Sequence, residues 1–325
     1  MKTIINIFLF FSLLFTFSCS QSQTIHAQKW MKQNGKIKIL STTEMINDLV
    51  SAIGGEHIDC LTLIFGGLDP HSYELVKGDD EKFSRADIVF SNGLGLEHGA
   101  CLVNTIKNHP NSIALGDEIR KGFPGKILMT DGAIDPHIWM DVSLWLCIID
   151  PIEQSLSKLD PDHRNDYKKN AKSLKKRLLD VHSEILDLIH SIPAEKRYLV
   201  TSHDAFYYFA RAYLAENNEK VEWKERFCAP EGLAPDNQMS SLNIVNIIKH
   251  LKKFNIKVIF PESNVSRDSI RKIILAGKKK DLNLKISDDP LYGDSMEVVE
   301  TIPGENYIKM MRHNADVICK QIKKN

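Results

Sequence analysis

The sequence predicts an α/β protein of two lobes, each a mainly parallel sheet flanked by helices, joined by one long rigid helix. Short apolar runs alternate with helical patterns in residues 37–160 and again in residues 193–325. Between them, residues 161–192 contain no glycine and no proline after Pro161. We therefore expect a signal peptide and tether at residues 1–36, lobes at 37–160 and 193–325, and a linking helix at 161–192.

Length and composition exclude several classes of protein. A chain of 325 residues is long enough for two ordinary domains, and 43% hydrophobic with 26% charged residues is typical of a globular protein. Basic and acidic side chains number 42 each, without the basic stripe of a nucleic-acid-binding protein. We expect a monomer that does not bind nucleic acid.

The N-terminus carries an export signal. Lys2 precedes an apolar run at residues 4–17 that is too short to span a bilayer, which is typical of a secretory signal peptide. Cys19 follows this run in a loose likeness of a bacterial lipobox, so the mature chain is expected in the periplasm, with Cys19 as a candidate lipid anchor. The alternative is cleavage after Ala27. The remaining cysteines are odd in number and form no C-x-x-C pair, so no disulfide pairing is predicted.

The first lobe shows the alternation of a parallel sheet with crossover helices. Strands are expected where apolar and β-branched residues cluster, at residues 37–42, 58–65, 87–91 and 112–115. Helices are expected at residues 44–53, 97–108 and, with a break near Asp150 and Pro151, 142–159. The stretch from Asp117 to Gly132 is rich in glycine, is expected to be irregular and contains no histidine.

The linking helix has clear boundary signals. Asp160 and Pro161 provide a capping residue and a proline at its first position, and Pro193 ends it. Leu174, Leu178 and Val181 begin an apolar face at spacings of three and four. About 30 residues in a helix span roughly 45 Å, enough to join two lobes.

The second lobe repeats the pattern of the first. Strands are expected at residues 197–201, 220–227, 256–260 and 282–286. Helices are expected at residues 205–215, 240–254, 266–276 and 307–323.

Several potential metal ligands follow apolar runs. Two Asp-Pro-His turns place His71 and His137 after prolines that fix the backbone, and His203 follows the strand expected at 197–201. Asp288, Asp289 and Asp294 form an acidic stretch in the second lobe. Open α/β sheets bind ligands beyond the carboxyl ends of their strands, and three imidazoles with one carboxylate suit a first-row metal. Accidental turns with exposed imidazoles are the alternative.

Four motifs resemble those of the metal-specific solute-binding proteins of ABC transporters. Residues 66–74 (GGLDPHSYE), 135–141 (DPHIWMD), 201–209 (TSHDAFYYF) and 291–296 (LYGDSM) are similar to that family's four ligand motifs, in order and at suitable spacing. The resemblance includes the long helix and covers nearly the whole mature chain. Gly293 departs from it, because a serine is common there.

The resemblance implies His71, His137, His203 and Asp294 as the metal ligands, with Asp288 or Asp289 as alternatives to Asp294. It also implies capture of manganese, iron or zinc between the lobes and delivery to an ABC permease in the inner membrane. The absence of the histidine-rich loop that zinc receptors often carry favours manganese or iron. Asp69, Asp135, Asp141 and Asp204 are candidates either for orienting the imidazoles or for capping turns.

Two other functions remain open at this point. A zinc-dependent hydrolase is disfavoured because the chain has no HExxH motif, so we expect no enzymatic activity. A surface adhesin is the other alternative. For a receptor, a continuous linking helix predicts small lobe shifts and local movement of the Asp294 loop on metal loading.

Overall fold

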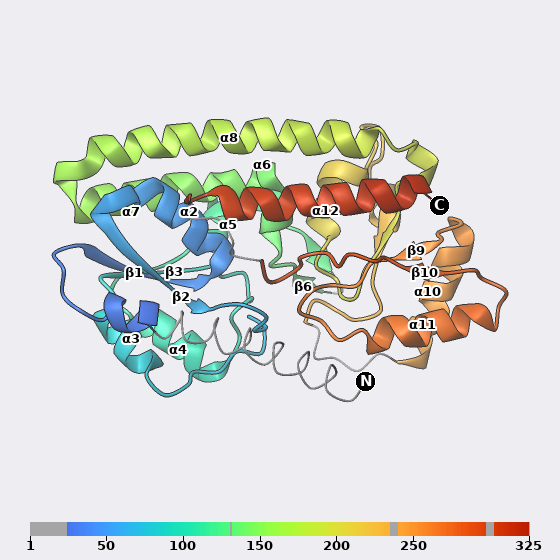
Figure 1. Ribbon diagram of the computed structural model, residues 1–325, viewed down its shortest axis with the longest axis horizontal. Helices are drawn as coiled ribbons and strands as arrows, with labels where there is room; N and C mark the ends of the chain where they lie inside the picture. The colour runs from blue at the N-terminus through green and yellow to red at the C-terminus, as the bar shows by residue number, and fades with distance from the viewer. Residues whose placement is uncertain (1–24, 131, 235–239, 297–301, 325) are drawn as a thin grey trace, which may run out of the picture.

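A computed structural model describes residues 25–130, 132–234, 240–296 and 302–324. It confirms the predicted α/β class: two halves, each with parallel strands and flanking helices, lie side by side beneath one long helix, α8 (Figure 1). The signal peptide and Cys19 lie outside the described residues. Among the described helices, none is both long and apolar enough to cross a bilayer.

The first half is built on a four-stranded parallel sheet with the order β2-β1-β3-β4. Its strands match the expected ranges closely: β1 (Ile37–Thr43), β2 (Ile58–Ile64), β3 (Ile88–Ser91) and β4 (Ser112–Ala114). Because all four strands run the same way, their carboxyl ends meet at one edge, where the loop that carries His71 leaves β2.

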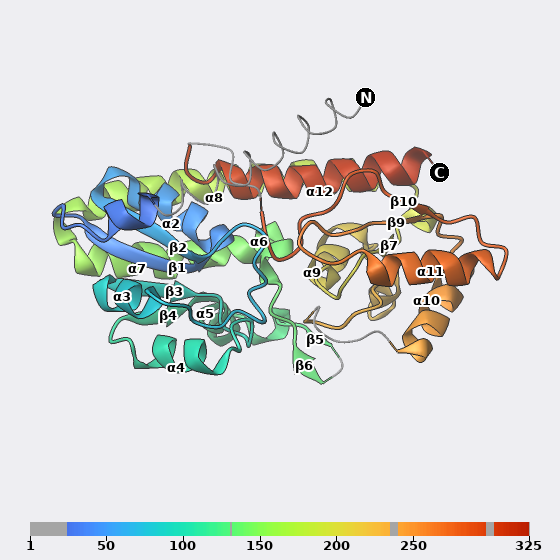
Figure 2. The ribbon, with the colours of Figure 1, turned by 60° about the horizontal axis from the view of Figure 1, so that its bottom comes forward.

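Helices cover both faces of this sheet. α2 (Glu44–Gly54) packs on one face, and α3 (Asp79–Arg85) and α4 (Ala100–Asn108) pack on the other (Figure 2). Leu40 and Val89 face α3 and α4, whereas Ile39 and Phe90 face α2. The sheet is therefore buried on both sides, which accounts for the continuous apolar runs of its strands.

Some elements differ from the sequence prediction. The stretch expected to be irregular includes most of α5 (Leu115–Gly122) and the strand β5 (Met129–Thr130), which pairs antiparallel with β6 (Ala133–Ile134) just beyond it. The break expected near Pro151 lies earlier, in a 3₁₀ turn at Leu146–Ile148 between α6 (Val142–Trp145) and α7 (Ile149–Leu159). Pro151 stands in the first turn of α7, where its missing N–H costs no hydrogen bond.

The segment expected to be a tether packs in part on the first half. Residues 25–30 are helical, and Trp30 is 1% exposed beneath the sheet. Its indole Nε1 donates to the Asp59 carbonyl at 2.9 Å. The folded part of the chain thus begins before Lys36.

The second half has shorter strands than expected. β7 (Leu199–Val200) pairs in parallel with β8 (Phe227–Cys228), and β9 (Val258–Ile259) with β10 (Lys285–Ile286). A bond from the Phe260 N–H to the Val200 carbonyl, 2.8 Å long, joins the two pairs. Around them lie α9 (Tyr207–Phe209), the π-helical turn Ala210–Leu214, α10 (Ser241–Lys253) and α11 (Asp268–Lys278).

The strand expected at 220–227 is wrong over most of its length. Residues Glu222–Arg226 form a 3₁₀ helix, and only Phe227 and Cys228 pair as β8. Arg226 is buried and donates to the Ala194 carbonyl at 2.8 Å, so its side chain fixes this turn.

Two long helices connect the halves (Figure 1). α8 (Arg164–His190) follows a 3₁₀ turn at Pro161–His163 and packs on α2, α7 and the turn Ala210–Leu214. α12 (Glu305–Lys324) lies beside α8. Asp48 on α2 accepts hydrogen bonds from the Gly304 and Tyr307 N–H groups at 3.0 Å each, so the start of α12 is held to the first half. Cys319 near its other end donates to the Leu188 carbonyl of α8.

The apolar face of α8 generates a stability prediction with a neighbouring control. Leu178 is fully buried, whereas Leu179 is 50% exposed. Leu178→Ala should lower the free energy of unfolding by about 2–5 kcal/mol, because a buried leucine leaves a cavity. Leu179→Ala should change it by less than about 0.5 kcal/mol. Urea denaturation of both variants provides the comparison, and equal losses would show that the interface of α8 is not as described.

Candidate metal centre

Four side chains from both halves converge on one buried point. His71, His137, His203 and Asp294 each offer an atom within 4.8 Å of the others, and their exposed fractions are 4% or less. Nε2 of His203, His137 and His71 lies 3.0, 3.3 and 3.6 Å from the Asp294 carboxylate. Among the described residues no other group of histidines, cysteines and acids meets the same criterion.

The two Asp-Pro-His turns share one hydrogen bond but use their aspartates differently. In each turn the aspartate accepts a hydrogen bond from the histidine N–H, at 2.9 Å for Asp69 and 3.0 Å for Asp135. Asp135 also accepts from Nδ1 of His137 at 2.7 Å, whereas Asp69 accepts from the Ser72 hydroxyl at 2.7 Å. Asp135 therefore orients an imidazole and Asp69 only caps its turn.

Sequence reasoning missed the residue that orients His203. Glu262, 2% exposed, lies 2.7 Å from Nδ1 of His203 and accepts from the Ser202 and His203 N–H groups at 2.9 Å each. It comes two residues after the strand expected at 256–260, at the edge where ligands are expected. This position after a strand could have identified Glu262 as a site residue from the sequence, although no motif marks it.

Gly293 fits its position because Glu262 leaves no room for a side chain. A Cβ added there would lie 2.2 Å from Oε2 of Glu262 and 3.3 Å from Cε1 of His203. The Gly293 carbonyl accepts a hydrogen bond from the Trp139 indole at 3.0 Å, which links the Asp294 loop to the second Asp-Pro-His turn. Gly293 therefore lies in a tight contact with Glu262 and is hydrogen-bonded to Trp139 of the first half.

The other acidic candidates lie apart from this cluster. Asp288 and Asp289 are exposed, whereas Asp294 is 4% exposed and contacts all three imidazoles. Asp141 accepts from the Ser143 N–H at 3.0 Å and caps α6. Of these carboxylates, only Asp294 has the geometry of a fourth ligand.

Burial and charge give the three imidazoles different proton affinities. Burial lowers the pKa of His71 to about 3. Burial also opposes the charged form of His137, but Asp294 and Asp135 outweigh it and raise the pKa to about 9. The pKa of His203 is raised well above its usual value in the same way, through Asp294 and Glu262. Two of the three imidazoles are therefore protonated at neutral pH, beside the buried carboxylate of Asp294.

Glu44 connects the two loops that carry the first and last candidate ligands. Its carboxylate, at the start of α2, accepts from the Gly66 N–H at 3.1 Å and from the Met296 N–H. Gly66 precedes the loop of His71, and Met296 lies two residues after Asp294. Burial raises the pKa of Glu44 to about 7 despite these two donors. The contact holds the Asp294 loop against the first half.

Comparison with known proteins identifies relatives over nearly the whole chain. A family model described as zinc-uptake complex component A, periplasmic, matches residues 39–321. The chain is 35% identical to the metal-binding protein YtgA of Chlamydia pneumoniae, over 97% of this chain and 93% of that protein. It is 33% identical to the manganese-binding lipoprotein MntA of Bacillus subtilis, over 96% and 97%.

Solved structures agree in fold with the present one. Fe(III)-bound YtgA from Chlamydia trachomatis superposes with a TM-score of 0.83 at 33% identity, covering 88% of this chain and 98% of that one. The periplasmic zinc-binding protein TroA from Treponema pallidum superposes with a TM-score of 0.79 at 27% identity, covering 89% and 99%. Both matches extend across the two halves and the helices that connect them.

The raised pKa of Glu44 predicts a pH-dependent stability difference. Between its ordinary value of 4.5 and about 7, the folded chain holds a proton on Glu44 that the unfolded chain has lost. Raising the pH through this window should therefore destabilise the wild type, by about 2–3 kcal/mol from this group. Glu44→Gln removes that contribution, so its stability relative to the wild type should rise by this amount between pH 5 and pH 8.

Denaturant titrations at both pH values measure this difference. Glu56→Gln, at an exposed position on the turn that follows α2, is the control. Its free energy of unfolding should change with pH as that of the wild type does. If the free energies of unfolding of Glu44→Gln and the wild type changed equally with pH, the raised pKa of Glu44 would be contradicted.

Proposed function

The chain belongs to the family of periplasmic zinc-uptake component A proteins, metal-binding receptors of ABC transporters, and from this premise we propose that it captures a transition metal ion for import. His71, His137, His203 and Asp294 are the proposed ligands. The observation that carries this assignment is their convergence from both halves at one buried point. The ion would be handed to an ABC permease in the membrane.

Burial of the centre favours capture over catalysis. A catalytic metal site keeps an open position for water or substrate. Here all four ligand groups are almost fully enclosed, and an Asp294 carboxylate binding through both oxygens would fill the shell. We therefore propose that the protein has no hydrolytic activity, and neither hydrolase nor adhesin is retained as an alternative.

Asp135 and Glu262 are proposed to prepare two of the ligands. Asp135 accepts from Nδ1 of His137, and Glu262 is paired with Nδ1 of His203, so Nε2 of each imidazole is left to bind the metal. A carboxylate behind an imidazole also strengthens it as a donor to a cation. The ion would thus meet two fixed imidazoles and one carboxylate that is already ionised, because His203 and His137 hold the pKa of Asp294 well below its usual value against the effect of burial.

Manganese or iron is the proposed physiological cargo. With neutral imidazoles, the carboxylates of Asp135, Glu262 and Asp294 give the centre three negative charges, which suits a hard cation better than a soft one. Relatives carry the names of a manganese-binding lipoprotein and an Fe(III)-bound receptor, and Zn²⁺ should bind the same nitrogen-rich set in vitro.

The location and motion of the receptor follow from the same proposal. We propose a monomer in the periplasm, exported by its signal peptide and anchored through Cys19, as the lipoprotein names of several relatives suggest. It is not expected to bind nucleic acid. Because α8 and α12 both join the halves, release should involve small lobe shifts and movement of the Asp294 loop rather than wide hinge opening.

Metal content tests the ligand assignment. His137→Ala and Asp294→Asn should each lower the bound metal of protein purified from its native envelope from one ion per chain to below about 0.1, because each removes a ligand from a closed shell. His190→Ala, at an exposed position on α8, is the control and should retain the ion. Elemental analysis provides the measurement. Full occupancy in His137→Ala would refute the assignment.

Proton release tests the state of the ligands before binding. His137 and His203 hold protons at neutral pH and must lose them to bind metal, so between one and two protons should be released per ion at pH 7. Apparent affinity should therefore rise by up to about 100-fold per pH unit as the pH increases toward 9.

Titration calorimetry in buffers of different ionisation enthalpy counts these protons. Asp135→Asn removes one cause of the raised pKa of His137, so it should release fewer protons per ion than the wild type. Binding without any proton release would mean that the imidazoles are already neutral.

A further inference from the structure

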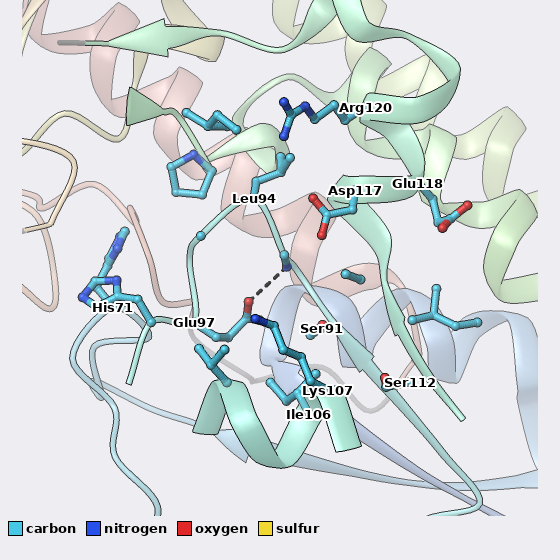
Figure 3. Close-up of a pocket in the computed structure, with 18 of the residues that line it drawn as sticks. His71, Ser91, Leu94, Glu97, Ile106, Lys107, Ser112, Asp117, Glu118 and Arg120 are labelled. Carbon is cyan, nitrogen blue, oxygen red and sulfur yellow. Dashed lines mark hydrogen bonds between the residues drawn. The ribbon is translucent and has the colours of Figure 1, made fainter. Parts of the chain in front are cut away.

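One cleft reaches the buried centre from the surface at His71. A cleft of about 1220 Å³ lies between α4, α5 and β6, and of the four clustered residues only His71 lines it. Figure 3 shows His71 at one edge of this cleft beside Glu97, with Asp117, Glu118 and Arg120 of α5 across from it. The cleft is far larger than a bare ion requires, so a hydrated ion can reach His71 within it.

His71 is also the least constrained of the three imidazoles. Nδ1 of His137 is held by Asp135 and Nδ1 of His203 by Glu262, both at 2.7 Å. Within residues 25–130, 132–234, 240–296 and 302–324, the side-chain hydrogen bond and the ion pair of His71 both involve Nε2, and no carboxylate is paired with its Nδ1. Rotation of the His71 ring therefore separates Nδ1 from no carboxylate, whereas rotation of His137 or His203 would pull Nδ1 away from a buried one.

An exposed histidine stands directly outside His71. His98 lines the same cleft, and its ring centroid lies 5.8 Å from that of His71 with the planes tilted by 50°. Two imidazoles that share one ion, with each nitrogen about 2.0–2.1 Å from it, have centroids separated by about 5–6.5 Å. The two rings are thus already spaced to hold one ion between them.

The backbone on both sides of His98 is fixed. Glu97 accepts hydrogen bonds from the Thr42 hydroxyl at 2.6 Å and from the Asn92 and Gly93 N–H groups at 2.8 and 3.0 Å. At Gly99 a Cβ would lie 2.3 Å from the Tyr73 carbonyl, so the chain packs directly on the loop that carries His71. The Cα of His98 is therefore held at a constant position relative to the loop that carries His71.

We propose that metal ions enter and leave through this cleft, with His98 as a transient outer ligand that passes the ion to a rotating His71. The inference rests on the proposed function. A hydrated divalent transition metal ion would exchange water for the His98 imidazole first, then bind His71, and lose its remaining water as His71 turns inward. His98 acts on the rate of exchange and not on the final complex, in which the four buried ligands hold the ion.

Stopped-flow kinetics with Zn²⁺ as the probe tests this route. In His98→Ala the association rate and the dissociation rate into excess chelator should both fall by at least tenfold. Kd should change by less than threefold, and binding should stay at one ion per chain. His98→Asp, which keeps a metal-binding group at the same place, should retain most of the wild-type rate. His190→Ala, exposed on α8 away from the cleft, is the control and should match the wild type in both rates.

The outcomes separate this inference from the proposed function. Wild-type rates in His98→Ala with one bound ion would overturn the entry route and leave the receptor function intact. Loss of equilibrium binding in His98→Ala would also overturn it, because His98 would then belong to the final ligand set. Failure of the wild type itself to bind Zn²⁺, Mn²⁺ or Fe²⁺ would instead refute the proposed function.

Discussion

The contact between the Asp294 carboxylate and three imidazoles is the interaction on which the rest of the structure depends. His71 and His137 come from the first half, and His203 and Asp294 from the second, so the contact exists only when the halves are held in register. An isolated carboxylate at this depth would take up a proton or be expelled, because desolvation of its charge is costly. His137 and His203 keep the Asp294 carboxylate ionised. Asp135 and Glu262 in turn orient these two imidazoles through Nδ1.

Contacts remote from the metal centre hold the two halves in this relative position. Asp48 holds the start of α12 to α2, and Arg177 on α8 pairs with Glu305 on α12. Glu44 and the Trp139–Gly293 hydrogen bond then hold the Asp294 loop against the first half. Two long helices join the halves, so under the proposed function metal exchange would depend on side chains and loops. Asp135 and Glu262 are paired with Nδ1 of His137 and His203, whereas the ion pair of His71 is made by Nε2.

Much of this could be predicted from the sequence, and the failures have physical causes. The strands of the first sheet and α8 carry strong periodic signals, and the Asp-Pro-His turns carry stiff local geometry. Glu262 could not be assigned to His203, because 59 residues separate them and only the fold brings them together. The role of Gly293 likewise depends on that distant carboxylate. α5 was missed because the glycines at and after its end suggested an irregular stretch. The strand expected at 220–227 does not form over most of its length, because the buried Arg226 side chain donates to the Ala194 carbonyl and fixes a 3₁₀ turn there.

X-ray absorption spectroscopy of the manganese- or iron-loaded protein tests the central claim most directly. The account predicts three imidazole nitrogens and one or two carboxylate oxygens around the ion, at about 2.0–2.2 Å, with no sulfur ligand. A first shell made mainly of oxygen, or one that contains sulfur, would contradict the assignment of the buried cluster as the metal centre.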